Sequence, residues 1–231
     1  MSDIKTETSD VKRNLLVYYD QTAVVRDERG IADWKAAERG YFLALLQAEG
    51  KRRLLEIGAG PGQDSLFFQQ HGLAVVCTDL SPQMVALCRQ KNLTAHVMDF
   101  YHLNFPAASF DAVFALNCLL HVPKPDLPQV LAQIQRVLCP GGLFYFGVYG
   151  GKEHDGIWRD DPHEPKRYFS FYLDEQIQQA VTPFFTPVSF HVVRLENVDD
   201  HYFQSMIWRC PPSPGGFGDA NPVESNVKNV H

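Results

Sequence analysis

Three glycines at alternate positions constrain this chain more than any other feature of its sequence. Gly58, Gly60 and Gly62 follow a short apolar run, 54–57, and precede a stretch of helical character, 63–71. This order predicts a strand, a tight loop and a helix. Because glycine has no Cβ, a ligand can approach the loop backbone, and the helix start offers free N–H groups and a positive dipole end. The stretch therefore predicts a binding loop for a nucleotide-like cofactor.

The spacing of these glycines differs from the fingerprint of nicotinamide dinucleotide sites. In G-x-G-x-x-G the third glycine stands three places after the second, and that place holds Gln63 in this chain. The acidic Glu56 also stands just before the loop. The spacing therefore argues against a nicotinamide oxidoreductase.

Composition suits one soluble α/β domain of 231 residues, because 45% of them are hydrophobic. The net charge is −6 and the sequence has no basic run, so no nucleic-acid partner is expected. Five cysteines, an odd number without a C-x-x-C pair, predict a reduced, cytoplasmic protein. No apolar run is long enough to cross a membrane, so no membrane partner is expected.

Acidic residues follow two further predicted strands. The apolar run 73–79 ends in Asp79, and the run 94–98 is followed by Asp99. A carboxylate with two acceptor oxygens at Asp79 can bind both hydroxyls of a ribose. Asp99 can accept from an adenine amino group, or alternatively begin a turn or cap the short connection. Because ligands bind at the carboxyl ends of strands in such sheets, the binding role is favoured for both.

Strands and helices alternate through residue 148, which predicts βαβ units and a parallel sheet. Before the first strand, Asp33 is a plausible N-cap of a helix that ends at Gly50. The clearest helix covers 125–138, where apolar residues recur at helical spacing. Near the end, two strands at 188–195 and 201–208 are joined by a turn too short for a parallel crossover, so they are antiparallel.

The chain divides into three predicted parts. Residues 1–50 form an N-terminal helical cap, and 51–210 form the cofactor-binding core. Within the core, 149–172 has no clear period and is rich in Gly, Asp, His, Pro and aromatic residues, which indicates a substrate lid. Residues 211–231 are rich in Pro, Gly, Asn and Ser and are predicted to be a disordered tail.

Four motifs occur in order: Glu56-x-Gly58-x-Gly60-x-Gly62; Asp79-Leu80-Ser81-Pro82-x-Met84; Asp99 with Phe105-Pro106 and Ser109-Phe110-Asp111; and Arg136-Val137-Leu138-x-Pro140-Gly141-Gly142. With these motifs the chain resembles class I S-adenosylmethionine-dependent methyltransferases of the small-molecule, type 11 kind. The resemblance implies an α/β fold with a Rossmann-like, doubly wound, seven-stranded sheet that is mostly parallel with an antiparallel last strand. It also implies S-adenosyl-L-methionine as the cofactor.

The resemblance implies roles around the methionine part of that cofactor. Gly58, Gly60 and Gly62 would pass beside it, and Glu56 would organise the loop or reach the amino group through water. Asn117, at the end of the fourth strand, would contact the methionine part or form the floor beneath the methyl group.

The resemblance also assigns the adenosine part. Asp79 would bind the ribose, while Leu80 and Met84 would flank the adenine. Asp99 would recognise the edge of the adenine ring and Phe100 its face.

The segment after the fourth strand reads Asn-Cys-Leu-Leu-His over 117–121, so the Asn-Pro-Pro-Tyr or Asp-Pro-Pro-Tyr motif of some relatives is absent. This argues against amino methylation of nucleic-acid bases or of protein glutamine. The predicted acceptor is therefore a small molecule, with an oxygen, nitrogen, sulfur or carbon nucleophile.

His121 is the first candidate for a general base, because it follows the fourth strand and histidine titrates near neutral pH. The alternative is a histidine that caps or packs against the next helix. Candidate substrate residues lie in the lid and in the N-terminal part, and no metal site is predicted. They are Tyr149, Trp158, His163 and Tyr168, with Tyr18, Tyr19 and Arg39 as further contacts to cofactor or substrate. For the lid aromatics the alternative is simple packing.

The sequence thus predicts in-line transfer of a methyl group from a sulfonium to a small molecule, in a monomer or homodimer. The protein would align the nucleophile, the methyl group and the sulfur and would exclude water. The alternative function is a methyltransferase-like binding or regulatory protein that holds the cofactor without chemistry.

Overall fold

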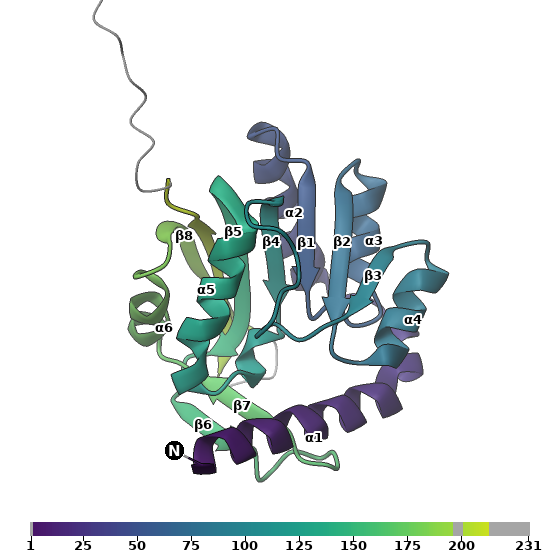
Figure 1. Cartoon of the computed structure of the whole chain (residues 1–231), viewed down its shortest axis with the longest axis vertical. Coiled ribbons are helices and arrows are strands. Elements are labelled where there is room, and N and C mark those ends of the chain that lie inside the picture. Colours follow the sequence, from purple (N-terminus) through teal and green to yellow (C-terminus); the bar gives the residue numbers. More distant parts are fainter. Residues whose placement is uncertain (1, 196–200, 213–231) are drawn as a thin grey trace, which may run out of the picture.

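The computed structural model describes residues 2–195 and 201–212, with side chains from residue 10 onward. The main strands are β1 (Arg53–Ile57), β2 (Ala74–Asp79), β3 (Thr94–Val97), β4 (Phe110–Leu116), β5 (Leu138–Gly150), β8 (Thr186–Val193) and β9 (Tyr202–Arg209). They form one seven-stranded sheet in the order β3-β2-β1-β4-β5-β9-β8 (Figure 1). Only β9 runs antiparallel to its neighbours β5 and β8, while the other neighbouring pairs are parallel. The predicted fold class is confirmed.

The helices are α1 (Ser2–Asp27), α2 (Asp33–Ala48), α3 (Gln63–Gln70), α4 (Pro82–Gln90), α5 (Leu127–Val137) and α6 (Asp174–Val181), with short 3₁₀ turns η1 (Leu119–His121) and η2 (Lys124–Asp126). None of the helices in the described part of the chain combines the length and the apolar character that a membrane span needs.

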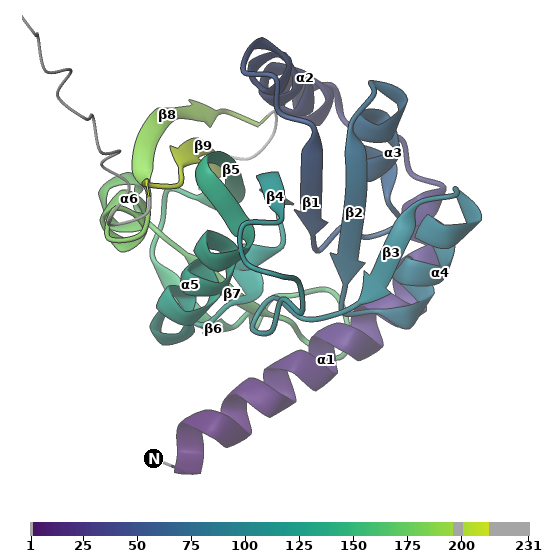
Figure 2. The same ribbon diagram turned by 45° about the horizontal axis from the view of Figure 1, so that its top comes forward.

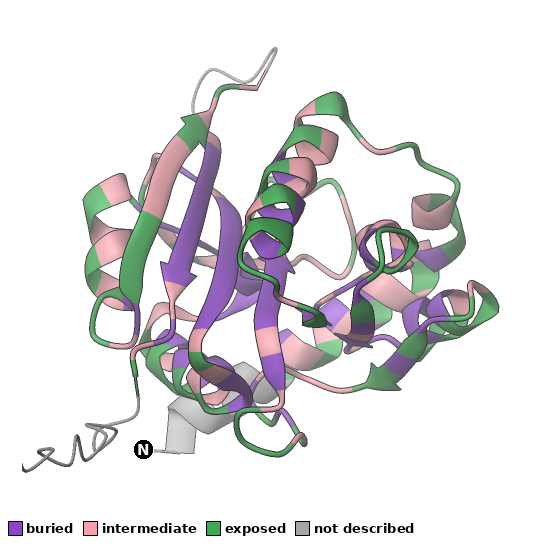
Figure 3. Ribbon diagram, turned by 90° about the horizontal axis from the view of Figure 1, so that it is seen from above, coloured by how far each residue is buried: buried purple, intermediate pink, exposed green. Residues whose placement is uncertain are grey.

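Side chains alternate between two cores, one on each face of the sheet. Val113 and Ala115 of β4 belong to the core under α5 and α6, whereas Ala112 and Phe114 belong to the core under α2 and α3. This period of two is what a strand buried on both faces requires. Figure 3 shows the central strands as the most buried part of the molecule.

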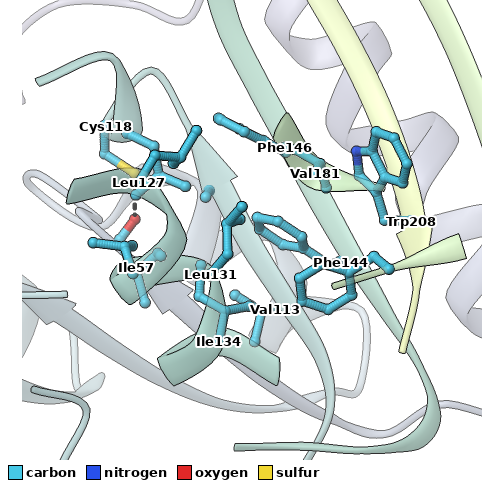
Figure 4. Packing of buried hydrophobic residues seen from close by; sticks show 14 of the residues in the cluster. Ile57, Val113, Cys118, Leu127, Leu131, Ile134, Phe144, Phe146, Val181 and Trp208 are labelled. Carbon is cyan, nitrogen blue, oxygen red and sulfur yellow. Dashed lines mark hydrogen bonds between the residues drawn. The ribbon is translucent and has the colours of Figure 1, made fainter. Parts of the chain in front are cut away.

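Helix α5 illustrates why the larger core is stable. Leu131 and Ile134 are fully buried against Val113 and Phe144 of the sheet (Figure 4). Burying each such side chain contributes roughly 1.5–3 kcal/mol. The predicted apolar stripe is confirmed, although the helix itself begins at Leu127 after a 3₁₀ turn.

Two predicted helix starts have different outcomes. Ser81 caps α4 as predicted, because its hydroxyl accepts a hydrogen bond from the Met84 N–H at 3.1 Å and Pro82 follows it. The prediction for Asp33 is wrong, since Ala32 is the N-cap of α2 and has no side-chain bond. Asp33 is the first helical residue, where its carboxylate favours the positive end of the helix dipole.

Helix α1 is the main element that the sequence did not predict as such. It crosses the edge of the sheet where β1 and β2 end (Figures 1 and 2). Val11, Leu15 and Tyr18 form its buried stripe. This helix lies over the strand ends, whereas α2 packs on a face of the sheet through Phe42 and Leu46.

The segment 150–172 is partly regular, which corrects the prediction of an aperiodic loop. It contains β6 (His154–Ile157) and β7 (Tyr168–Phe171), which pair in an antiparallel two-stranded sheet. Each strand has only four residues, so neither produces a recognisable period. The turn expected at 197–200 and the tail from 213 onward lie outside the described residues.

Candidate functional site

A cavity of about 310 Å³ lies at the carboxyl ends of β1, β2 and β4, between the sheet and α1. This is where ligands bind in open parallel sheets. Most of the predicted cofactor residues and the candidate base line it. They are Glu56, Gly58, Gly60, Asp79, Leu80, Met84, Phe100, Asn117 and His121.

The three glycines of the loop all have positive φ but serve different needs. A Cβ placed on Gly58 would lie 2.3 Å from the Cβ of Cys118, whereas one on Gly60 would meet nothing within 4 Å. Gly62 does not line the cavity, and its Cβ would lie 2.8 Å from the sulfur of Cys88 in α4. Of the three glycines, only Gly58 and Gly60 therefore line the cavity, while Gly62 permits packing against α4.

Asp79 stands at the end of β2 and holds the glycine loop. One carboxylate oxygen accepts from the Gly60 N–H at 2.8 Å, and the other from the Ser81 N–H at 2.9 Å. Burial raises the pKa of Asp79, and these two hydrogen bonds oppose the rise. Each oxygen retains a lone pair for a ligand hydroxyl.

Glu56 is buried below the loop and accepts a hydrogen bond from the Ser65 hydroxyl of α3. Burial, reinforced by the charge of Asp64, holds the pKa of Glu56 well above its usual range. Asp64 also lines the cavity and pairs with Arg39 at 3.1 Å. Arg39, a predicted contact residue, therefore acts on the site through Asp64 and does not line the cavity itself.

The structure does not bring Asp99 into the cavity. Its carboxylate accepts from Lys12 Nζ at 2.7 Å and from the backbone N–H groups of Tyr101 and His102, each at 3.0 Å. This is the capping role, here combined with an ion pair to α1. Its neighbour Phe100 does line the cavity.

Asn117 ends β4 with a φ of 56°, a left-handed conformation that asparagine tolerates better than most residues. Its backbone N–H donates to the Gly147 carbonyl at 2.7 Å. Its side-chain Oδ1 is buried and has no hydrogen-bond partner among the described residues. An unpaired buried acceptor in a cavity indicates a site for a ligand donor.

His121 lies buried at the other end of the cavity, and burial lowers its pKa to about 3. Its Nδ1 is 2.7 Å from the Tyr168 carbonyl oxygen, which can only accept, so Nδ1 carries the proton. Nε2 is therefore an acceptor, and the Tyr19 hydroxyl donates to it at 2.6 Å. Tyr19 also lines the cavity, and burial raises its pKa to about 12.

The predicted substrate residues of the lid do not line the cavity. The Tyr168 hydroxyl donates to Asp155 at 2.8 Å, and the rings of Trp158 and Phe171 pack 5.5 Å apart. His163 lies 4.8 Å from the ring of Tyr18, another predicted contact that is buried outside the cavity.

Tyr149 packs instead against Trp34, with the ring centroids 6.3 Å apart. In this structure the lid aromatics therefore take the alternative packing role.

Three cavity cations were missed by the sequence reasoning, namely Arg26, Arg29 and Lys35. A signal was present, because Val11, Leu15 and Tyr18 follow helical spacing. A helix there would have placed Arg26 seven residues after Tyr19, on the same face.

Metal binding has no support in the described part of the chain, where no three His, Cys, Asp or Glu side chains are grouped to hold an ion.

Comparison with known proteins agrees with this geometry. A family model described as "Methyltransferase domain" matches residues 55–146. A malonyl-[acyl-carrier protein] O-methyltransferase of Hamiltonella defensa is 31% identical over 176 residues, covering 72% of this chain and 62% of that protein. A demethylmenaquinone methyltransferase of Tropheryma whipplei is 31% identical over 129 residues, covering 54% of this chain and 51% of that protein. The chain thus spans roughly half to three fifths of the length of these relatives.

Among solved structures, a Burkholderia thailandensis 1,6-didemethyltoxoflavin-N1-methyltransferase with bound 1,6-didemethyltoxoflavin and S-adenosylhomocysteine has a TM-score of 0.68. It is 23% identical, and the match covers 89% of this chain and 90% of that one, which shows a shared fold. The motifs, the sheet order and these matches agree, and the chain belongs to the class I S-adenosylmethionine-dependent methyltransferases.

Proposed function

We propose that the chain binds S-adenosyl-L-methionine and transfers its methyl group to a small-molecule acceptor. The observation that carries this proposal is the pairing of two groups in one cavity. Asp79 offers carboxylate lone pairs suited to a ribose, and Asn117 offers an unpaired buried acceptor suited to an ammonium group. The matched relatives carry the names of methyltransferases, which supports the same reaction type.

The remaining lining residues fit the other parts of this cofactor. Leu80, Met84 and Phe100 supply an apolar end for the adenine. The open side of Gly60 leaves room for the methionine chain. Lys35 lines the cavity and interacts with Asp64 in the first turn of α3, so it is available to bind the cofactor carboxylate.

The bound cofactor would supply a methyl group on a positively charged sulfur, which needs no further activation. The protein then has to orient the acceptor and exclude water, for which α1 and the lid cover the edge of the sheet. Where the nucleophile must lose a proton, Tyr19 Oη accepts it while the Tyr19 hydroxyl proton passes to His121 Nε2. The Tyr168 carbonyl holds the Nδ1 proton of His121 throughout this transfer.

Titration calorimetry with S-adenosylmethionine and S-adenosylhomocysteine tests the proposal. We expect binding below millimolar concentration, and Asp79→Ala should weaken it roughly 10–100-fold because hydrogen bonds to a charged group contribute about 1.5–3 kcal/mol. Asp79→Asn keeps one acceptor oxygen, so its affinity for the cofactor should lie between those of the wild type and Asp79→Ala. A folded sample that binds neither compound would exclude the proposal.

Formation of S-adenosylhomocysteine with a panel of metabolites separates an enzyme from the alternative. Cofactor binding without transfer to any of them would favour the non-catalytic binding protein.

A further inference from the structure

Arg26 is a cavity-lining cation that forms no ion pair in the described part of the chain, although its guanidinium lies near the rings of Tyr18 and Tyr19. It lies in the last turn of α1 and lines the cavity. Its Nε is buried and makes no hydrogen bond, and Nη2 makes only a long one, 3.4 Å from the Tyr18 hydroxyl. No carboxylate of the described residues lies within ion-pair distance of it.

Several other cations around the site are paired, whereas Lys35 and the exposed Arg29, which also line the cavity, form no ion pair in the described part of the chain. Arg167 forms a two-pronged pair with Asp161 at 2.8 and 3.0 Å. Ion pairs also join Arg39 to Asp64, Lys12 to Asp99, and Lys91 to Asp27. Arg26 is partly exposed, but its Nε is buried, and a partly desolvated guanidinium without a carboxylate partner indicates where an anion from outside the chain binds.

The position of Arg26 identifies which part of the site this anion occupies. Its guanidinium carbon lies 4.9 Å from the centre of the Tyr19 ring, and the Tyr19 hydroxyl is hydrogen-bonded to His121. An anion bound by Arg26 therefore lies beside the pair that takes the acceptor proton.

We propose that Arg26 binds an anionic oxygen group of the methyl acceptor, so that this cavity takes small carboxylates rather than neutral molecules. The planar guanidinium, with its parallel N–H groups, matches a carboxylate better than a point charge does. The inference rests on the proposed function and specifies its acceptor class. The cofactor carboxylate is the other source of such a group, and Lys35 is assigned to it.

The test uses the full chain saturated with S-adenosylhomocysteine and two matched probes, benzoate and its neutral analogue benzamide. Calorimetry should show benzoate binding at least about tenfold tighter than benzamide. Arg26→Met should weaken benzoate binding at least about tenfold, and Arg26→Lys should weaken it less. Arg13→Met is the matched control, since Arg13 lies on the same helix, paired with Asp10 and exposed, and its loss should change nothing.

Folding of the variant is checked in the same samples. Methionine keeps the apolar stem of the arginine and removes an uncompensated charge, so Arg26→Met should unfold at or above the wild-type temperature. Its affinity for S-adenosylhomocysteine should equal that of the wild type.

Three results would overturn the inference: benzoate that fails to bind, benzoate and benzamide that bind equally, or benzoate affinity that survives Arg26→Met. In a fourth result, Arg26→Met would bind S-adenosylhomocysteine more weakly but would bind 5′-methylthioadenosine, which lacks the amino-acid part, as the wild type does. This result would also overturn the inference, because it would assign Arg26 to the cofactor. If the wild type does not bind S-adenosylhomocysteine at all, it is the proposed function that fails.

Discussion

Gly58 and Gly60 share a left-handed backbone conformation but face different surroundings. Alanine at either position costs about 1–2 kcal/mol of backbone strain. At Gly58 the new Cβ would also overlap Cys118, which adds about 1–3 kcal/mol. At Gly60 it would enter open space at the cavity wall.

We therefore expect Gly58→Ala to lose clearly more unfolding free energy than Gly60→Ala. Gly60→Ala should instead lose most of its cofactor affinity, at least about tenfold, because its methyl group takes ligand space. Urea unfolding and calorimetry with S-adenosylhomocysteine measure the two effects on the same samples. Equal losses of stability in both variants would refute the distinction.

At the scale of single residues, the sequence identified the site residues that can be recognised from the segment next to them. The glycines and Asp79 adjoin a recognisable strand, so their place at the sheet edge followed from the pattern. Asp99 adjoins a strand equally well, but Lys12, 87 residues away, pairs with it. Arg26 and the bond between Tyr19 and His121 likewise depend on the placement of α1, which no local pattern shows.

Among the elements, the lid contains a buried ion pair between Asp161 and Arg167. Although burial raises the pKa of Asp161, hydrogen bonds from Arg167 outweigh it and bring that pKa to about 2. Asp161 also accepts from the backbone N–H groups of His163 and Arg167, at 3.3 and 3.1 Å. Arg167 in turn lies 4.3 Å from the ring of Tyr18, so the same pair joins the lid to α1.

Asp161→Ala should loosen the lid while the sheet stays intact. It leaves a buried guanidinium unpaired, so we expect amide exchange over 158–171 to accelerate at least about tenfold, with β1 and β4 unchanged. Asp160→Ala, an exposed neighbour in the same segment, is the control and should not differ from wild type. Unchanged exchange in Asp161→Ala would show that the other contacts of the lid hold it without this ion pair.

Elements were predictable where their pattern is long or repeated. The stripe of α5 and the apolar runs of β2 and β4 were read correctly because each is buried against a sheet or within it. Helix α1 was missed because only one of its sides is buried against the rest of the protein, while much of another side faces the polar cavity. The pairing of the short strands β6 and β7 depends on contacts between the two ends of the segment. The periodicity of the sequence does not show such contacts.

For the whole molecule, alternation of strands and helices predicted a parallel sheet, and the short turn between the last two strands predicted that they are antiparallel, while the seven strands followed from the family resemblance. The balance of buried charge was not predictable, since it depends on contacts between distant segments. Buried acids Glu56, Asp64 and Asp79 have raised pKa values, so they favour the folded state as the pH falls. His121 acts in the opposite sense.

The pKa of His121 is about 3 in the folded chain, against an ordinary 6.5. Between these values the unfolded chain binds the extra proton, so the contribution of His121 to stability is complete above pH 6.5 and is lost as the pH falls toward 3. The guanidinium charges of Arg26 and Arg167 reinforce the effect of burial, and Asp161 opposes it.

His121→Gln keeps a polar side chain at this site but does not titrate. The difference in unfolding free energy between wild type and variant should therefore shrink by about 2 kcal/mol from pH 7.5 to pH 5, at a limiting slope of about 1.4 kcal/mol per pH unit. Urea unfolding at each pH measures it, and the buried acids cancel because both proteins contain them. Parallel stability curves for the two proteins would mean that His121 has the same pKa in the folded as in the unfolded chain, and the lowering of its pKa by burial would then be wrong.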